Sequence, residues 1–275
     1  MPESESPAAT HVFDEAIDLV FAGDNRFTGH THAAYANMVG PFGGITAATI
    51  LRAVEQHPDV LGIPLSLTIN FAGPVAEGPF DIVARPVRTN RSTQHWSIEL
   101  SQDGAVATTA TAVFGTRRAT WSSTEHPAPP VPPVEDVASQ PFPDFVAWGR
   151  NYEMRFVEGA IPEPNAGEHP DSTTTLWVRD NPPRPLDFPA LAALGDVFFP
   201  RIFLRRGHVL PAGTVTLTIY FHADAEALAD QSDSAVLATA RSHQFRNGYF
   251  DQSAHLWGSD GTALATSHQL VYFKA

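Results

Sequence analysis

The stretch DFPALAALGDVFFPRIF, Asp187 to Phe203, decides how the rest of the chain is interpreted. Its apolar residues occupy nearly every side of a helix, which predicts a buried helix rather than one at a surface. Asp196 lies in its middle, with no Lys or Arg three or four residues away. Because burial of an unpaired carboxylate is costly, such a group is usually paired elsewhere, hydrogen-bonded or kept for chemistry.

Pro200 limits this helix. A proline ring clashes with the carbonyl group four residues back, which here belongs to Asp196, so the helix is expected to bend or end there. Two interpretations of Asp196 therefore remain open at this point. It lies at a frayed helix end in contact with solvent, or it is a functional carboxylate.

The composition describes an ordinary globular protein. The 275 residues suffice for one large domain or two small ones, and 43% of them are hydrophobic. A net charge of −13 argues against a surface that binds nucleic acid or anionic membranes. The absence of cysteine excludes disulfides, thiolate metal sites and a cysteine nucleophile.

Neither a signal peptide nor a membrane span is expected from the sequence. The first ten residues carry neither a basic region nor an apolar run, and no stretch reaches the length of a membrane span. A soluble, cytoplasmic protein is expected. His30 and His32 are two apart, as on one face of a strand, but no third ligand follows at a suitable spacing, so we expect no metal.

The segment GPFGGITAATILRAVEQHP, residues 40–58, predicts a helix that Gly43 and Gly44 open and Pro58 closes. Glycines at a helix start allow close approach and leave N–H donors free for an anion or a polarised carbonyl group. Tight packing of the loop against a sheet is the alternative. Antiparallel strands are predicted next, within LSLTINF (65–71), FDIVARPV (80–87) and HWSIELSQDGAVATTATAVF (95–114).

A proline-rich linker, Glu125 to Pro143, separates this half from a second one with the same order of elements. Two offsets relate the halves: the strand 65–71 matches 215–221 at an offset of 150, and the hairpin at Asp103-Gly104 matches Asp260-Gly261 at 157. A duplicated unit of roughly 110 residues is predicted. We assign residues 1–118 to the first unit, 119–145 to the linker and 146–275 to the second unit, which carries Asp196.

One long apolar helix followed by antiparallel strands predicts a curved sheet wrapped around that helix, and two such units protect their edges by joining sheets. The chain resembles the type II, TesB-like acyl-CoA thioesterases. The resemblance rests on GPFGGITAATILRAV (40–54), LAALGDVFFP (191–200), GTVTLTIYFH (213–222) and DGTALATSHQ (260–269). It implies an α+β double hotdog fold, in which two tandem helix-wrapped antiparallel sheets form one continuous sheet.

The resemblance also implies a site. In that family a water is held by an Asp on the second helix, a Thr or Ser on the next strand and a Gln on the last strand, which here are Asp196, Thr214 and Gln269. A buried carboxylate is a competent general base for thioester hydrolysis. Gln269 shares an apolar strand face with Val271 and Phe273, where an amide needs a partner. Thr214 has no polar counterpart in the first half, which carries Pro64 there.

The expected substrate is a fatty acyl-CoA, with no cofactor, metal, nucleic acid or membrane partner, and the chain is a candidate homo-oligomer. Gly43 and Gly44 would offer donors to the developing oxyanion. Coenzyme A is polyanionic, and Arg205 and Arg206 just after the second helix are candidates to bind it. Arginines 85, 88 and 91 are further candidates, and solvated surface arginines are the alternative explanation for all of them.

Two other functions stay open. MaoC-like enoyl-CoA hydratases share the fold and join a catalytic Asp to a His through an Asn-Pro pair, but here Phe199 stands for the Asn and Arg201 for the His. A non-catalytic acyl-CoA-binding protein would keep the fold without turnover. The residues favour an acyl-CoA thioesterase that hydrolyses a fatty acyl-CoA to the free acid and CoA by general-base activation of a water.

Overall fold

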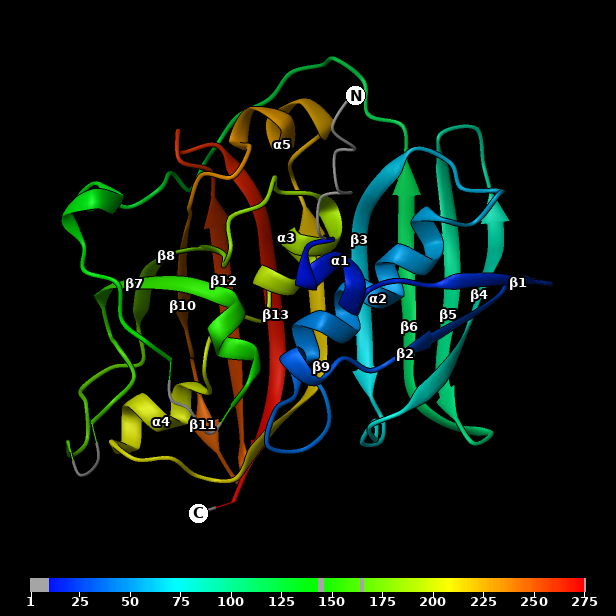
Figure 1. Cartoon of the computed structure of the whole chain (residues 1–275). Coiled ribbons are helices and arrows are strands. Elements are labelled where there is room, and N and C mark those ends of the chain that lie inside the picture. The colour runs from blue at the N-terminus through cyan, green and yellow to red at the C-terminus, as the bar shows by residue number, and fades with distance from the viewer. Residues whose placement is uncertain (1–9, 143–145, 164–165, 275) are drawn as a thin grey trace, which may run out of the picture.

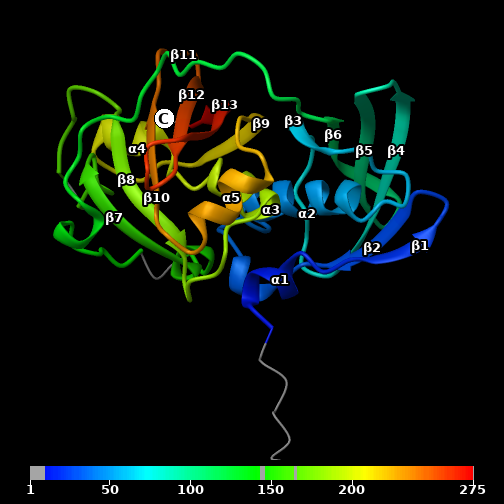
Figure 2. The ribbon, with the colours of Figure 1, turned by 90° about the horizontal axis from the view of Figure 1, so that it is seen from above.

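The computed structural model describes residues 10–142, 146–163 and 166–274. Within these residues thirteen strands form one antiparallel sheet, in the order β1-β2-β4-β5-β6-β3-β9-β13-β12-β10-β8-β7, with β11 paired only to β12. Both halves of the sheet curve around helices that lie between them (Figures 1 and 2). This arrangement confirms the predicted double hotdog.

The first half begins with α1 (Val12–Ala16), and its main helix is α2 (Gly43–Glu55). A short 3-10 helix, η1 (Ala33–Tyr35), precedes α2. The strands of this half are β1 (Val20–Gly23), β2 (Arg26–His30), β3 (Ile63–Phe71), β4 (Pro79–Thr89), β5 (Thr93–Gln102) and β6 (Ala105–Gly115). They include all the strands predicted before the linker.

The second half repeats the plan with additional elements. Its helices are η2 (Val134–Asp136), η3 (Trp148–Asn151), α3 (Phe188–Leu194), α4 (Arg201–Arg206) and α5 (Ala225–Gln231). Its strands are β7 (Tyr152–Glu158), β8 (Thr174–Asp180), β9 (Ala212–Phe221), β10 (Val236–Arg241), β11 (Phe245–Arg246), β12 (Tyr249–Trp257) and β13 (Ala263–Phe273). The sequence did not indicate α5, β10 or β11.

The two halves meet where β3 pairs with β9. Thr68 lies opposite Thr218, 150 residues further along, and their hydroxyl oxygens are 3.1 Å apart. Thr68 and Thr218 are equivalent positions of the two units, and in a two-fold relation equivalent residues face each other across the junction. The registers agree as well, because Leu67 opposite Ala112 corresponds to Leu217 opposite Gln269.

The helix predicted from Asp187 to Phe203 is interrupted next to Asp196, as expected from Pro200, and it consists of two helices. The first, α3, ends at Leu194, and its start is capped by Asp187, whose side chain accepts the N–H of Ala190. Pro200 occupies the N-cap position of α4. Its ring excludes a helix that runs on from Asp196, so the chain turns after α3 and restarts.

The core runs through both halves, because α2 and α3 pack against each other in the middle of the molecule. The linker is not free of the core, since Val137 joins a smaller apolar cluster with Trp177 and Trp257 on the second half. Residues 1–9 and 143–145, which belong to the predicted polar start and linker, lie outside the described residues, and the predicted unit boundaries stay predictions. No helix of the described chain is long and apolar enough to cross a membrane.

Candidate active site

Asp196 lies in the turn that follows α3, and it is buried. Its side chain is 8% exposed, and its N–H donates to the carbonyl of Ala193 at 3.1 Å. One of its carboxylate oxygens, Oδ2, is 2.5 Å from where a Cβ on Gly43 would lie. Asp196 is therefore at a helix end, but the interpretation that this end is open to solvent is wrong.

The structure brings Asp196 together with Gln269 and Thr214. The amide nitrogen of Gln269 donates to Asp196 Oδ1 at 2.8 Å, and the Thr214 hydroxyl donates to Gln269 Oε1 at 3.2 Å. The sheet creates this arrangement, because Thr214 on β9 pairs with Val271 on β13. Gln269 and Val271 are two residues apart, so they share a strand face.

The N-terminus of α2 completes the surroundings of the carboxylate. Phe42 is the N-cap residue and its side chain cannot cap the helix. The N–H of Gly44 instead donates to Asp196, so a carboxylate from the other half caps this helix. A Cβ on Gly44 would lie 2.6 Å from the Ala193 carbonyl oxygen. The two glycines thus serve tight packing, and the N–H of Gly44 is engaged rather than free.

Asp196 has no cation beside it in the described residues, and burial dominates its titration. Desolvation raises the pKa of Asp196 to about 7, although the hydrogen bonds from Gln269 and Gly44 act in the opposite direction. A carboxylate with such a pKa accepts a proton readily near neutral pH. This environment suits a general base.

Ser267, which the sequence reasoning did not single out, holds the peptide that precedes Asp196. Its hydroxyl donates to the carbonyl of Gly195 at 2.7 Å, and its side chain is 1% exposed. It shares the inward face of β13 with Gln269, two residues away. Like Gln269, Ser267 is a polar residue on an apolar strand face and needs a hydrogen-bond partner.

Arg201 fastens the segment between Asp196 and α4. It is fully buried, and its guanidinium donates to the Phe199 carbonyl at 2.6 and 3.1 Å and stacks on the Phe199 ring. Further hydrogen bonds go to the Ser172 carbonyl and the Thr174 hydroxyl. Desolvation lowers the pKa of Arg201 to about 9. Fixing the Phe199 carbonyl fixes the turn that carries Asp196.

The predicted coenzyme A arginines contact a loop of the second half. Arg205 donates to the His169 carbonyl, and Arg206 forms an ion pair of 3.0 Å with Glu168. Next to them lies a surface hollow of about 560 Å³, lined by residues 159, 160, 162, 166–169 and 204. Arginines 85, 88 and 91 are exposed on β4 and the turn after it. None of these contacts reaches Asp196 or Gln269.

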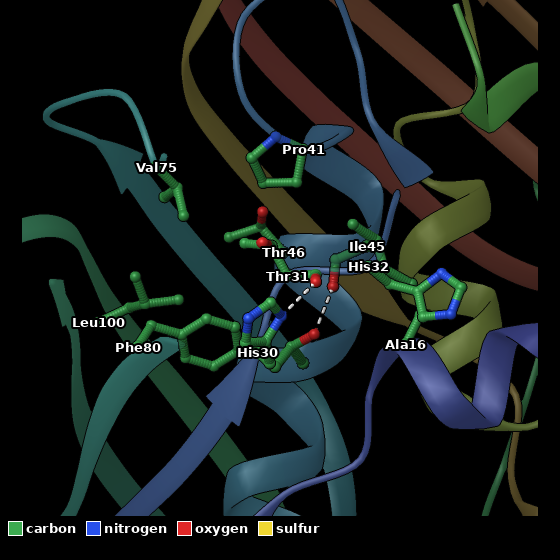
Figure 3. A pocket seen from close by; sticks show the side chains of 11 residues that line it. Ala16, His30, Thr31, His32, Pro41, Ile45, Thr46, Val75, Phe80 and Leu100 are labelled. Carbon is green, nitrogen blue, oxygen red and sulfur yellow. Dashed lines mark hydrogen bonds between the residues drawn. The ribbon is translucent and has the colours of Figure 1, made fainter. Parts of the chain in front are cut away.

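A second, small hollow lies beside α2 (Figure 3). Ile45 and Thr49 line it, and they lie on roughly the opposite side of α2 from Gly43 and Gly44, since each helical residue turns by about 100°. This hollow is separate from Asp196. His30 and His32 also border it, but no group of three or more metal-ligating side chains occurs in the described chain.

Two family models cover most of the chain. Residues 32–115 match an acyl-CoA thioesterase N-terminal domain and residues 126–273 match an acyl-CoA thioesterase C-terminal domain. No curated protein matches the chain.

Solved structures share the fold over nearly the whole length. A conserved protein of unknown function with a hot dog fold from Alicyclobacillus acidocaldarius is 51% identical, with a TM-score of 0.93 over 97% of this chain and 99% of that one. A TesB protein from Mycobacterium avium is 20% identical (TM-score 0.78, 96% and 98% covered). An acyl-CoA thioesterase II, TesB2, from Mycobacterium marinum is 19% identical (TM-score 0.75, 95% and 98% covered). The two latter likenesses carry the fold alone.

Proposed function

The chain belongs to the acyl-CoA thioesterase family, and from this premise we propose that it hydrolyses a fatty acyl-CoA to the free acid and CoA. The observation that carries the proposal is the hydrogen-bonded chain from Thr214 through Gln269 to Asp196, set against the N-terminus of α2. A buried base, a group that orients it and helix N–H donors are the parts that acyl transfer to water needs.

Each part has a role in the proposed reaction. Asp196 takes a proton from a water as the water oxygen attacks the thioester carbonyl carbon. The second amide hydrogen of Gln269 and the lone pairs of the Thr214 hydroxyl hold that water in line. Collapse of the tetrahedral intermediate breaks the C–S bond and releases CoA. N–H groups in the first turn of α2 lack partners within the helix, and the remaining ones would stabilise the oxyanion.

The surroundings of Arg201 favour hydrolysis over hydration of a double bond. Hydration in hotdog enzymes needs a second acid-base side chain at the position of Arg201. That guanidinium is fully buried, and its hydrogen bonds go to backbone carbonyls and the Thr174 hydroxyl. It keeps its charge near neutral pH because its pKa, although lowered, is about 9. Because its nitrogens are engaged with these acceptors inside the protein, Arg201 is a poor replacement for the second acid-base group.

We also propose one active site per chain. In the first half Ala112 stands at the register position of Gln269, and Pro64 stands at that of Thr214. Neither can hold a water. We keep Arg205 and Arg206 as candidate ligands of the coenzyme A phosphates, because an acidic chain needs local cations at that end of the substrate.

Release of free thiol from a panel of acyl-CoAs of increasing chain length tests the proposal. We expect multiple turnovers with at least one chain length, because the side chains proposed to hold the water, Thr214, Gln269 and Asp196, are already hydrogen-bonded to one another. Binding of acyl-CoA without thiol release would support the non-catalytic alternative. Hydration of crotonyl-CoA without thiol release would support the hydratase.

The rate of thiol release is expected to rise with pH and to reach half its plateau near pH 7. The base acts as the carboxylate, and burial raises the pKa of Asp196 to about 7, so protonation below that pH removes the active form. Gln269→Leu deletes a hydrogen bond that lowers this pKa, so the half-rise should move to higher pH and the plateau should fall. A profile that is flat between about pH 6 and 8, or a shift to lower pH, would contradict this assignment.

A further inference from the structure

Three buried polar atoms without a hydrogen-bond partner gather on one side of Asp196. Four such side-chain atoms occur in the described chain, and three of them are the hydroxyl oxygens of Tyr35 and Tyr152 and Oδ1 of Asp180. Buried polar groups almost always have a partner in the protein or an ordered water. Three orphans in one place therefore need a common explanation.

Backbone pairing places these groups together. Tyr152 lies directly opposite Asp180 on the neighbouring strands β7 and β8, so both side chains leave the same face of the sheet. Tyr35 is the last residue of η1. The side-chain amide of Asn151 donates to the Ala34 carbonyl of η1 at 2.7 Å and so holds η1 in place. The rings of Tyr35 and Tyr152 are 6.4 Å apart at a steep angle.

The cluster is near enough to Asp196 for the charge of this carboxylate to act on Tyr152, and it reaches an ion-pair group at the surface. On the inner side the Tyr152 ring is 6.1 Å from that of Phe42, which precedes the two glycines packed on Asp196. On the outer side Asp180 faces Arg184 at 3.8 Å. Arg184 also pairs with Asp14 at 2.8 Å and Asp187 at 2.7 Å, and the side chains of these two aspartates are more than two-fifths exposed.

The titration of these groups is compatible with passing a proton. Burial, together with the charges of Tyr35, Asp180 and Asp196, raises the pKa of Tyr152, so it stays a neutral phenol that both donates and accepts. Burial, and the carboxylates of Asp187 and Asp14, raise the pKa of Asp180 to about 7 against the lowering effect of Arg184. Burial thus raises the pKa of both carboxyl groups toward neutral pH, so each of them can hold and release a proton there.

We propose that Tyr35, Tyr152 and Asp180 enclose a buried water and that this cluster carries the proton taken up by Asp196 out to the Asp14–Arg184–Asp187 ion-pair group at the surface. The inference rests on the proposed hydrolysis. In that reaction water gives its OH to the acyl carbon and its proton to Asp196. The thiolate takes a proton from solvent and the product acid ionises there, so the proton on Asp196 is the one that must leave before the next turnover.

Rapid-mixing measurement of thiol release with Tyr152→Phe and Asp180→Asn tests the inference. At a pH well above the pKa of Asp196, the first turnover of both variants should keep the parental rate, because Asp196 starts as the carboxylate. Later turnovers should be slower by about tenfold or more. A positioned proton-transfer group contributes about 10² to 10⁴-fold, so the expected effect lies at or below the low end of that range. The trace then shows a burst of one thiol per chain, and the slow phase slows further in D2O. The parent protein shows no burst.

Tyr249→Phe is the matched control, because Tyr249 is half exposed on β12 and should alter neither phase. Two results would overturn the relay. If both variants turn over like the parent, the proton leaves another way, for example on the product acid. If first and later turnovers slow equally, the cluster only supports the structure. A parent protein that releases no thiol from any acyl-CoA would instead refute the proposed function.

Discussion

Asp196→Asn is expected to lower kcat for thiol release by about 10³-fold, within the range of 10² to 10⁴ that general acid–base catalysis contributes. The asparagine keeps the size of the side chain and can still accept the N–H of Gly44. It cannot take a proton from the attacking water. Substrate binding should change little, since the carboxylate acts on the water and not on coenzyme A, so kcat falls while KM stays near the parental value.

The same substitution should leave the protein as stable as the parent or make it more stable. Asp196 is buried with no cation beside it in the described residues, and burying a carboxylate in this way is unfavourable. Asp233→Asn, at an exposed aspartate, is the control and should change neither rate nor melting temperature. Parental activity in Asp196→Asn would remove Asp196 from the mechanism. A lower melting temperature would mean that the carboxylate serves the fold.

The fold could be predicted largely because it repeats. Alternating strands, a hairpin at Asp103-Gly104 and another at Asp260-Gly261 recur in order, and each signal is local. The break in the helix at Asp187–Phe203 was expected from Pro200 at about Asp196, and α3 ends next to that residue. The sequence did not indicate that Asp196, just past the end of α3, accepts a hydrogen bond from the N-terminus of α2, which is a contact between halves.

The site was predicted only where its residues carry a strand or family pattern. Thr214 stands out because the first half has Pro64 in its place, and Gln269 because it is an amide on the apolar strand face of Val271 and Phe273. In the sequence Arg201 was noted only because it replaces the histidine of the hydratases. No local pattern shows that its buried guanidinium donates to the carbonyl of Phe199 in the same turn. In the Tyr35, Tyr152 and Asp180 cluster, the sheet register joins Tyr152 to Asp180. Tyr35 lies more than a hundred positions earlier and reaches them only through tertiary packing.

Gly43→Ala is expected to lower kcat/KM about a hundredfold, because a misplacement of about 1 Å at a reacting group costs that much. The new methyl group would lie 2.5 Å from Asp196 Oδ2, closer than atoms can approach, and 3.4 Å from the Phe71 ring. The carboxylate must therefore move, and its bonds to Gly44 and Gln269 lengthen. Asp196 sits at a turn held by Ser267 and by the Arg201–Phe199 contact, so the backbone cannot yield to relieve the clash.

Gly73→Ala separates this steric effect from the general cost of replacing a glycine. The nearest atom to a Cβ at Gly73 is 3.9 Å away, so the substitution should preserve activity. Thiol release by Gly43→Ala, Gly73→Ala and the parent, with circular dichroism to check folding, makes the comparison. If Gly43→Ala is folded and as active as the parent, the Asp196 carboxylate can move without loss of activity, which would contradict the prediction. If instead it loses activity while still binding acyl-CoA, the contact between α2 and Asp196 positions the base, and the first half supports a catalytic residue of the second.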